Sequence, residues 1–394
     1  MTHDSASKAS GRTPTRGSRL DSVDLLRGIV LVVMTLDHAR AFFGTSGWDP
    51  GFATTSAPTF LTRWITHFCA PVFVLLAGTG ASLSLGRGRS KGELARFLLT
   101  RGAWLALLDG TVVSFAWLFR VGAPLVTDVL WVIGWSMIVL AALIRLPLRV
   151  TLIVGVVLVI GHNALDAVHA ASFGPVSWIW TVLHEQGLIR LPGGGDWFVG
   201  YPLIPWVGVM ALGYGLDSLL ADEPARRRRR LVLLGGAVVA AFVVIRGVNV
   251  YGDPHPWSKQ ANLAMSMFAF VSCTKYPPSL LFLLMTIGPA LLALVALDQV
   301  RPHPSNPLLV FGRVPLFHYI VHLYLIHLAA GLTFLPHMGA AAFHVDPEVP
   351  PAGFGVTLGG VYIVWVGAVL AMYPLCRWFG GFKQGRRSAW LSYL

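Results

Sequence analysis

Long apolar stretches follow one another along almost the whole chain, separated by short polar segments. An α-helix needs about 20 predominantly apolar residues to cross the hydrocarbon core of a bilayer. Ten stretches have about that length, at residues 24–43, 61–85, 96–119, 125–144, 149–165, 197–220, 231–248, 278–297, 306–332 and 353–378. The pattern predicts an all-α fold, a polytopic membrane helix bundle of about ten transmembrane helices.

Composition agrees with this prediction and excludes other classes of protein. The chain has 394 residues, of which 55% are hydrophobic and 12% are charged. A soluble domain carries about 25% charged residues, so this chain has too little charge to cover a water-facing surface. The three cysteines, Cys69, Cys273 and Cys376, are far apart. They match neither a disulfide framework nor a CxxC metal site.

Basic residues mark alternate connections between the predicted spans. The formal net charge is +12, and a run of five arginines, 226–230, lies between the sixth and seventh spans. Such a bias follows the positive-inside rule, which places both termini in the cytoplasm and requires an even number of spans. The arginine run is therefore expected to anchor the topology, and no nucleic-acid partner is expected, since that would need a basic face on a soluble domain.

Two regions are expected in the chain. Residues 1–18 are rich in Ser, Thr and Arg and predict a disordered basic tail, and residues 19–394 predict a single transmembrane domain. The first apolar run is too long for a signal peptide and lacks a small-x-small cleavage site. We find no internal repeat and no matching pair of interrupted spans, which are the usual indications of a carrier.

The first span carries ionisable residues, which are costly in a membrane and are functional candidates by default. Arg27 and His38 are 11 residues apart. On a helix they differ by about 20° in direction and lie about 16 Å apart along the axis. Asp24, three residues before Arg27, lies on the same face of the helix. We call this face, with Asp24, Arg27 and His38, the polar stripe. The alternative is an Asp24–Arg27 ion pair with a snorkelling arginine, together with a hydrogen-bonded interfacial histidine.

Other polar residues are candidates for the same site. His318 and His322 share one face of the ninth span, but the Glu of HExxH is missing, so no metal is expected. His67 precedes Cys69 at the predicted depth of His38. Lys275 belongs to a turn on the outside, where it faces either an anionic acceptor or a lipid headgroup. Two further expectations concern Asp109, which should be paired or neutral and could contact Arg27 or Arg313, and residues 191–197 (LPGGGDW), which predict a loop.

The sequence resembles the heparan-alpha-glucosaminide N-acetyltransferase catalytic-domain family, in its bacterial branch. Five blocks carry the resemblance, in this order: RLDSVDLLRGIVLVVMTLDHARAFF, FCAPVFVLLAGTGASLSLG, KYPPSLLFLLMTIGPALL, FGRVPLFHYIVHLYLIHL and YPLCRWFGGFKQGRRSAWLSYL. The spacing of Arg27 and His38 is also similar to the R-x10-H signature of acyltransferase-3 type membrane enzymes.

The resemblance implies an integral-membrane acetyltransferase of the bacterial cytoplasmic membrane. Such an enzyme moves an acetyl group from cytosolic acetyl-CoA, its co-substrate, to a sugar amine or hydroxyl on the other side. Its partners are the lipid bilayer, acetyl-CoA and a glycan acceptor, and a GxxxG at Gly355 and Gly359 would allow a homodimer. The resemblance implies that the catalytic residues are His38, Arg27, Asp24 and His322. It implies that Arg27, Arg313 and Arg101 bind the CoA phosphates. The acceptor would be bound by His67 and Lys275.

This sequence departs from the family pattern at His38. The lysosomal enzyme that names the family has asparagine at this position, and its proposed catalytic histidine lies in the following lumenal loop. The corresponding loop here, residues 44–59, contains no histidine. The departure favours direct transfer, with His38 as general base, over an acetyl-histidine intermediate.

Three other classes of protein also fit the sequence. A carrier or exporter of a small polar solute would use the intramembrane charges to line its pathway, and would transport without CoA. A b-type haem oxidoreductase would need facing histidines on two helices and would show a Soret band. A non-catalytic sensor would share the family's fold without its activity.

Overall fold

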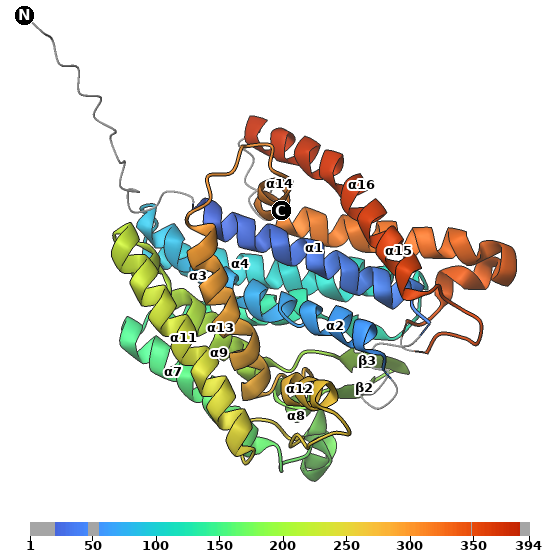
Figure 1. Cartoon of the computed structure of the whole chain (residues 1–394), viewed down its shortest axis with the longest axis horizontal. Helices are drawn as coiled ribbons and strands as arrows, with labels where there is room; N and C mark the ends of the chain where they lie inside the picture. The colour runs from blue at the N-terminus through green and yellow to red at the C-terminus, as the bar shows by residue number, and fades with distance from the viewer. Residues whose placement is uncertain (1–19, 46–54, 348, 387–394) are drawn as a thin grey trace, which may run out of the picture.

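The structure is a computed structural model that describes residues 20–45, 55–347 and 349–386. The tail expected at residues 1–18 lies outside these residues. The described chain is mostly helical, with 73% helix and 5% strand. Its helices form a bundle in which α1 runs through the middle (Figure 1).

The elements follow the apolar stretches of the sequence. The helices are α1 (Asp21–Phe43), α2 (Ala57–Thr66), α3 (Cys69–Gly86), α4 (Lys91–Leu108), α5 (Ser114–Leu118), α6 (Val129–Leu143), α7 (Leu148–Gly161), α8 (Ser177–Leu183), α9 (Leu203–Gly215), α10 (Asp217–Leu220), α11 (Pro224–Val248), α12 (Leu263–Val271), α13 (Leu280–Leu297), α14 (Pro307–Arg313), α15 (Pro315–Met338) and α16 (Leu358–Gly385). A π-helical turn, η2 (Asp109–Val113), joins α4 to α5, and 3-10 turns are η3 (His162–Leu165), η4 (Ala170–Val176) and η5 (Gly339–His344). The strands are β1 (Leu125–Thr127), β2 (Gly187–Leu191) and β3 (Gly195–Val199).

Eight helical stretches of the described chain are long and apolar enough to cross a membrane. They are Ala57–Gly86, Lys91–Leu118, Leu148–Leu165, Leu203–Leu220, Pro224–Val248, Leu280–Leu297, Pro315–His344 and Leu358–Lys383. The two other predicted spans correspond to α1, which carries several charges, and to α6, which has only 15 residues. The structure confirms an all-α polytopic membrane bundle, whereas the count of ten spans and the cytoplasmic termini stay predictions.

Two predicted spans are interrupted in the structure. The ninth consists of α14 and α15, which meet at Val314, where the backbone leaves the helical region (φ −131°, ψ 52°). Pro315 explains the break, because proline disfavours helical geometry in the residue before it. The second span consists of α2 and α3, and His67 lies at their junction.

The fourth and sixth predicted spans begin too early, because their first residues form strands. β3 pairs with β1 in parallel and with β2 antiparallel. The prediction of a loop at residues 191–197 was therefore wrong, since most of this segment belongs to the β2–β3 hairpin. Gly193 and Gly194 adopt φ values of 99° and 91°, which let the chain reverse tightly between the two strands.

The glycine pair that would allow a homodimer does not form a helix face. Gly359 belongs to α16, but Gly355 precedes this helix and has φ 97°. A side chain at Gly355 would collide with the backbone of Gly44. The structure therefore assigns Gly355 to a close approach within the chain, and the homodimer loses its supporting motif.

Close packing between α1 and α14 places two polar segments side by side. A Cβ atom on Gly28 would lie 1.9 Å from the Leu308 carbonyl oxygen, and one on Gly312 would lie 1.8 Å from the Asp24 carbonyl oxygen. The two backbones are thus in direct contact. This contact brings Arg313, at the end of α14, to the beginning of α1.

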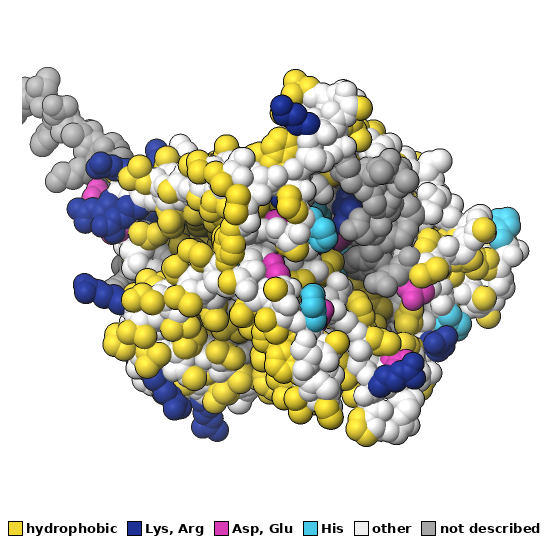
Figure 2. Space-filling view, turned by 90° about the horizontal axis from the view of Figure 1, so that it is seen from below, with side chains coloured by type: hydrophobic (Ala, Val, Ile, Leu, Met, Phe, Trp, Pro, Cys, Tyr) yellow, Lys and Arg dark blue, Asp and Glu magenta, His cyan; other side chains and the backbone are white. Residues whose placement is uncertain are grey.

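The surface separates hydrophobic side chains from basic ones, as the sequence predicts. Hydrophobic side chains cover much of the middle of the face in Figure 2, and Lys and Arg side chains gather at its left-hand end. This is the end at which α1 begins in Figure 1. Exposed residues on the outer helices include Val244 and Leu370, 62% and 68% exposed, as expected of side chains that face lipid. The distribution agrees with the orientation that the positive-inside rule predicts.

Candidate active site

A group of charged side chains lies where α1 begins. Arg27 Nη1 lies 3.2 Å from Asp24 Oδ1, and Arg27 Nη2 donates to the Leu76 carbonyl at 3.2 Å. Arg313 Nη2 lies 3.3 Å from Asp21 Oδ1. Two of the three arginines predicted to bind the CoA phosphates, Arg27 and Arg313, therefore lie at the same end of α1. Arg101 is on α4, where its guanidinium lies 5.9 Å from the Phe97 ring centre.

His38 contacts a histidine from the other end of the chain. His38 Nδ1 lies 2.8 Å from His322 Nε2 on α15, and the two rings are nearly parallel with centres 4.9 Å apart. His322 Nδ1 lies 2.7 Å from the His318 carbonyl oxygen. Both rings are buried. The sequence proposed each histidine separately, and the structure brings them together.

This chain of hydrogen bonds fixes the tautomer of both rings. A carbonyl oxygen only accepts, so His322 Nδ1 must carry hydrogen and, in a neutral ring, His322 Nε2 must accept. His38 Nδ1 then donates to His322, which leaves the lone pair of the neutral His38 ring on Nε2. A second residue that orients the ring and sets its tautomer is the arrangement found in general-base catalysis.

A carboxyl pair lies beside the two histidines. The Tyr319 ring meets the His38 ring edge-on at 6.2 Å, and the Tyr319 hydroxyl donates to Asp128 Oδ2 at 3.3 Å. The backbone N–H of Asp128 donates to Asp109 Oδ2 at 2.7 Å. The expectation that Asp109 contacts Arg27 or Arg313 was wrong, because Asp109 opens the π-helical turn η2, which directs it to the start of α6. Such turns are frequent at functional sites.

Sequence reasoning did not single out Asp128. A signal was present, since an aspartate directly before an apolar run is a typical N-cap. In the structure Asp128 is indeed the N-cap of α6 and accepts from the Val129 N–H. Its second carboxylate oxygen is the one that meets Tyr319.

Two further histidines are buried with both ring nitrogens unpartnered within the part of the chain that the structure describes. They are His67, at the α2–α3 junction, and His318, on α15. Their relative exposures are 6% and 0%. His67 lies within electrostatic range of Lys275, Asp37 and Arg40. A buried imidazole usually has a hydrogen-bond partner. Within the described part of the chain, the ring nitrogens of His67 and His318 are therefore free to bond a ligand inside the bundle. By contrast, His327 lies between two backbone carbonyls, those of Ala116 and Phe343.

Lys275 reaches the end of α1 from the segment between α12 and α13. Its Nζ lies 3.8 Å from Asp37 Oδ2, and Arg40 Nη2 lies 3.1 Å from Asp37 Oδ1. Asp37 and Arg40, three residues apart on α1, form an ion pair within one turn of the helix. No pattern in the sequence indicates that Lys275 joins them, because 238 residues separate Lys275 from Asp37.

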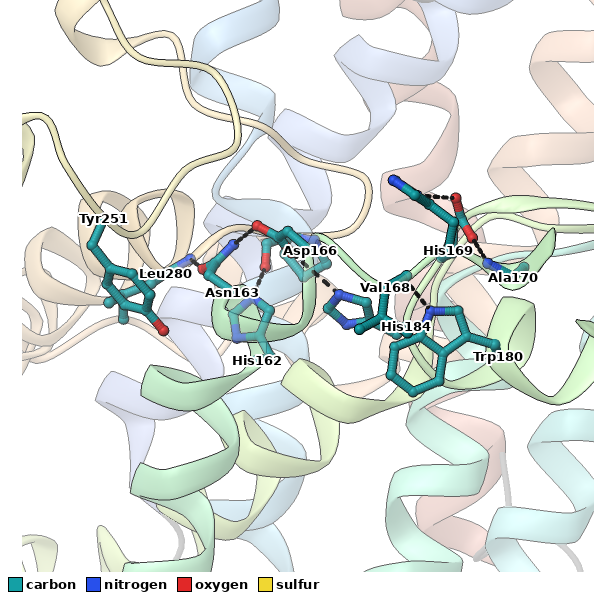
Figure 3. Close-up of polar contacts among 12 residues, drawn as sticks. His162, Asn163, Asp166, Val168, His169, Ala170, Trp180, His184, Tyr251 and Leu280 are labelled. Carbon is teal, nitrogen blue, oxygen red and sulfur yellow. Dashed lines mark hydrogen bonds and ion pairs between the residues drawn. The ribbon is translucent and has the colours of Figure 1, made fainter. Parts of the chain in front are cut away.

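Polar contacts on both sides hold the segment that carries Lys275. Asp253 accepts from the Thr274 N–H at 2.8 Å and from the Ser279 hydroxyl at 2.7 Å. His162 Nε2 lies 2.8 Å from the Pro278 carbonyl, and Asn163 accepts from the Leu280 N–H at 2.8 Å. Figure 3 shows that this group continues through Asn163 and Asp166 to His184. The position of Lys275 is therefore set by two other connections of the chain.

The donor set of the site is imidazole, carboxylate, ammonium and guanidinium. No three His, Cys, Asp or Glu side chains of the described residues are grouped so that they could hold a metal ion. The arrangement can accept and return a proton at His38. It also presents cations at both ends of α1.

Comparison with known proteins identifies the family. None of the curated proteins matches the chain. A family model described as "Heparan-alpha-glucosaminide N-acetyltransferase, catalytic" matches residues 19–251, more than half of the chain. The match includes Asp24, Arg27, His38 and His67, while Lys275 and His322 lie beyond it. The chain is thus a multi-pass membrane protein that belongs to the heparan-alpha-glucosaminide N-acetyltransferase catalytic-domain family, a family of membrane acetyltransferases.

Proposed function

We propose that this protein transfers an acetyl group from cytosolic acetyl-CoA to an amine or hydroxyl of a cell-envelope sugar outside the bacterial cytoplasmic membrane. The observation that carries the proposal is the hydrogen-bond chain from His38 through His322 to the His318 carbonyl. It provides a buried imidazole with its lone pair on Nε2, on the same helix as a cationic group suited to CoA.

The donor binds at the end of α1 where Asp24, Arg27 and Arg313 lie. CoA carries several phosphate charges, and arginine binds phosphate through two parallel hydrogen bonds. Arg27 and Arg313 each have a carboxylate partner that a phosphate can replace. Arg101 is the third basic residue that we assign to the donor. From Arg27 to His38 the helix rises about 16 Å, which the extended pantetheine arm spans.

His38 acts as the general base at the other end of the stripe. As the acceptor amine or hydroxyl attacks the thioester carbonyl, its proton moves to His38 Nε2, and the hydrogen bond to His322 stabilises the imidazolium. When the C–S bond breaks, the leaving thiolate takes this proton. A base in this position contributes about 10²- to 10⁴-fold to the rate. We assign His67 to acceptor binding, because both of its ring nitrogens are unpartnered.

The test is acetyl transfer from labelled acetyl-CoA by purified protein in lipid nanodiscs, with glucosamine and envelope glycan fragments as acceptors. His38→Ala should lower turnover at least 100-fold. His337→Ala is the matched control, since His337 lies on α15 but is exposed, and it should keep full activity. Wild-type turnover by a folded His38→Ala protein would refute the assigned mechanism.

The sidedness needs a separate measurement. Proteoliposomes with acetyl-CoA enclosed and acceptor outside should form product only when the protein is oriented with α1 beginning inside. A carrier, in contrast, would move solute in the same vesicles without any CoA. CoA-independent transport together with no acetyl transfer would replace the proposal.

A further inference from the structure

Asp37 has two cationic partners next to the catalytic histidine. It interacts with Arg40 at 3.1 Å and with Lys275 at 3.8 Å. All three side chains are largely buried, with relative exposures of 10% for Asp37, 6% for Arg40 and 12% for Lys275. Arg40 and Lys275 together carry two positive charges, and Asp37 carries one negative charge. The group therefore has a net charge of +1.

Lys275 keeps its charge in this position. Burial alone would lower the pKa of its ammonium group, but Tyr276 and Asp37 outweigh burial and raise the pKa above its usual value. Asp128, a further carboxyl group within electrostatic range of Lys275, accepts hydrogen bonds from Val129 and Tyr319. Asp37 is the carboxylate that Lys275 contacts directly.

The neutralisation of Asp37 does not explain the extra cation. Arg40 already meets Asp37 at the shorter distance, from the next turn of the same helix. Burying an additional ion carries a large desolvation cost. A protein that needed only to neutralise Asp37 would not have to bring a lysine from a separate segment held by Asp253, His162 and Asn163.

The extra cation contacts Asp37, the residue directly before His38 in the chain. Lys275 is within electrostatic range of both His38 and His67. When the acceptor attacks the acetyl thioester beside His38, negative charge develops on the carbonyl oxygen. A fixed cation in a site that excludes water stabilises such charge far more than one in water.

We propose that Lys275 is a catalytic residue that stabilises the oxyanion formed on the thioester carbonyl during acetyl transfer. The inference rests on the proposed function. The acceptor heteroatom forms a bond to the carbonyl carbon as its proton passes to His38 Nε2, and the carbonyl π electrons move to the oxygen beside Lys275 Nζ. When the carbonyl reforms, the C–S bond breaks, and the CoA thiolate takes the proton from His38. Asp37, itself held by Arg40, positions the ammonium group.

The first test is Lys275→Met, which removes the charge and keeps a similar length. We expect kcat to fall about 10²- to 10³-fold, the usual loss for one oxyanion donor. Binding of a ketone analogue of acetyl-CoA, with methylene in place of sulfur, should change less than threefold, because the loss affects the transition state. Lys259→Met is the matched control, since Lys259 is an exposed lysine of the neighbouring connection, and its kcat should equal that of the wild type.

A double variant separates catalysis from charge balance and also protects the test against misfolding. Asp37→Asn with Lys275→Met removes both charges, so a purely neutralising role of Lys275 predicts recovery of kcat. The proposal predicts that kcat stays at least 100-fold low in the folded double variant. Recovery in the double variant, or a kcat within threefold of wild type in Lys275→Met, overturns it.

Two comparisons define what a failure means. If Lys275→Met lowers the rate only toward anionic acceptors and leaves an uncharged sugar unaffected, Lys275 binds the acceptor and the oxyanion role is wrong. If His38→Ala is inactive while Lys275→Met is fully active, this inference fails and the proposed function stands. Full activity of His38→Ala overturns the proposed mechanism itself.

Discussion

The contact between α1 and α14 leads to a prediction whose size follows from the structure. In Gly28→Ala the new Cβ would start 1.9 Å from the Leu308 carbonyl oxygen, whereas ordinary contacts begin at 3.4 Å. The two helices must therefore separate by about 1.5 Å, because neither partner is a side chain that can turn away. Overpacking of this kind costs about 1–3 kcal/mol, occasionally more.

The separation should also affect the proposed donor site. Arg27 directly precedes Gly28, and Arg313 follows the second close contact, at Gly312. A displacement of about 1 Å in a binding group can cost about 100-fold in rate. We expect Gly28→Ala to have a lower thermal unfolding midpoint and at least a tenfold higher KM for acetyl-CoA.

Fluorescence-detected thermal unfolding and steady-state kinetics in nanodiscs would measure the two effects. Gly236→Ala is the matched control, because Gly236 is also in a long helix, α11, but a Cβ there meets nothing within 4 Å. Alanine is the better helix former, so this control should be as stable as the wild type or slightly more stable. If Gly28→Ala unfolds at the same temperature as Gly236→Ala and keeps its KM, the close contact is not present in the protein.

Three other residues give predictions that concern stability. Arg246 is buried and donates to four backbone carbonyls; Arg246→Lys keeps the charge but not the planar fork and should lower the unfolding midpoint. Arg227→Gln removes the partner of Asp298, a partly buried carboxylate 2.6 Å away, and should cost up to about 3–5 kcal/mol in a denaturation assay. Burial raises the pKa of Asp166, but hydrogen bonds from His184 and Asn163 outweigh burial and lower it. The ionised carboxylate therefore stabilises the fold above about pH 4, and this stabilisation is lost as the pH falls through the lowered pKa. Asp166→Asn should thus be less stable than the wild type at neutral pH, and the two stabilities should converge in acid.

The class of fold and the shared face of Asp24, Arg27 and His38 on α1 were predictable from local patterns in the sequence. Apolar length and charge are local properties, and a span of about 20 apolar residues has few alternatives to a membrane helix. Helical periodicity likewise placed Asp24, Arg27 and His38 on one face without any structure. The pair of Asp37 and Arg40 was predictable for the same reason, since residues three apart on a helix are neighbours.

Interruptions within the spans were harder to predict. Pro315 was a visible signal for the break between α14 and α15, but nothing as clear marks the junction at His67 or the π-helical turn at Asp109. Hydropathy averages over such features, because a broken helix and a continuous one can bury the same apolar side chains. The early starts predicted for the fourth and sixth spans have the same origin, since a buried strand is as apolar as a helix.

The residues that face one another across the bundle could not be predicted, because they depend on how the helices pack. His38 and His322 are 284 residues apart, and the tautomer of His38 depends on a carbonyl that no sequence pattern can place. Lys275 reaches Asp37 only because Asp253, His162 and Asn163 hold its segment. Periodicity shows which side of a helix is polar, but the partner on that side is set by packing between helices, where glycines such as Gly28 and Gly312 determine how closely two backbones approach.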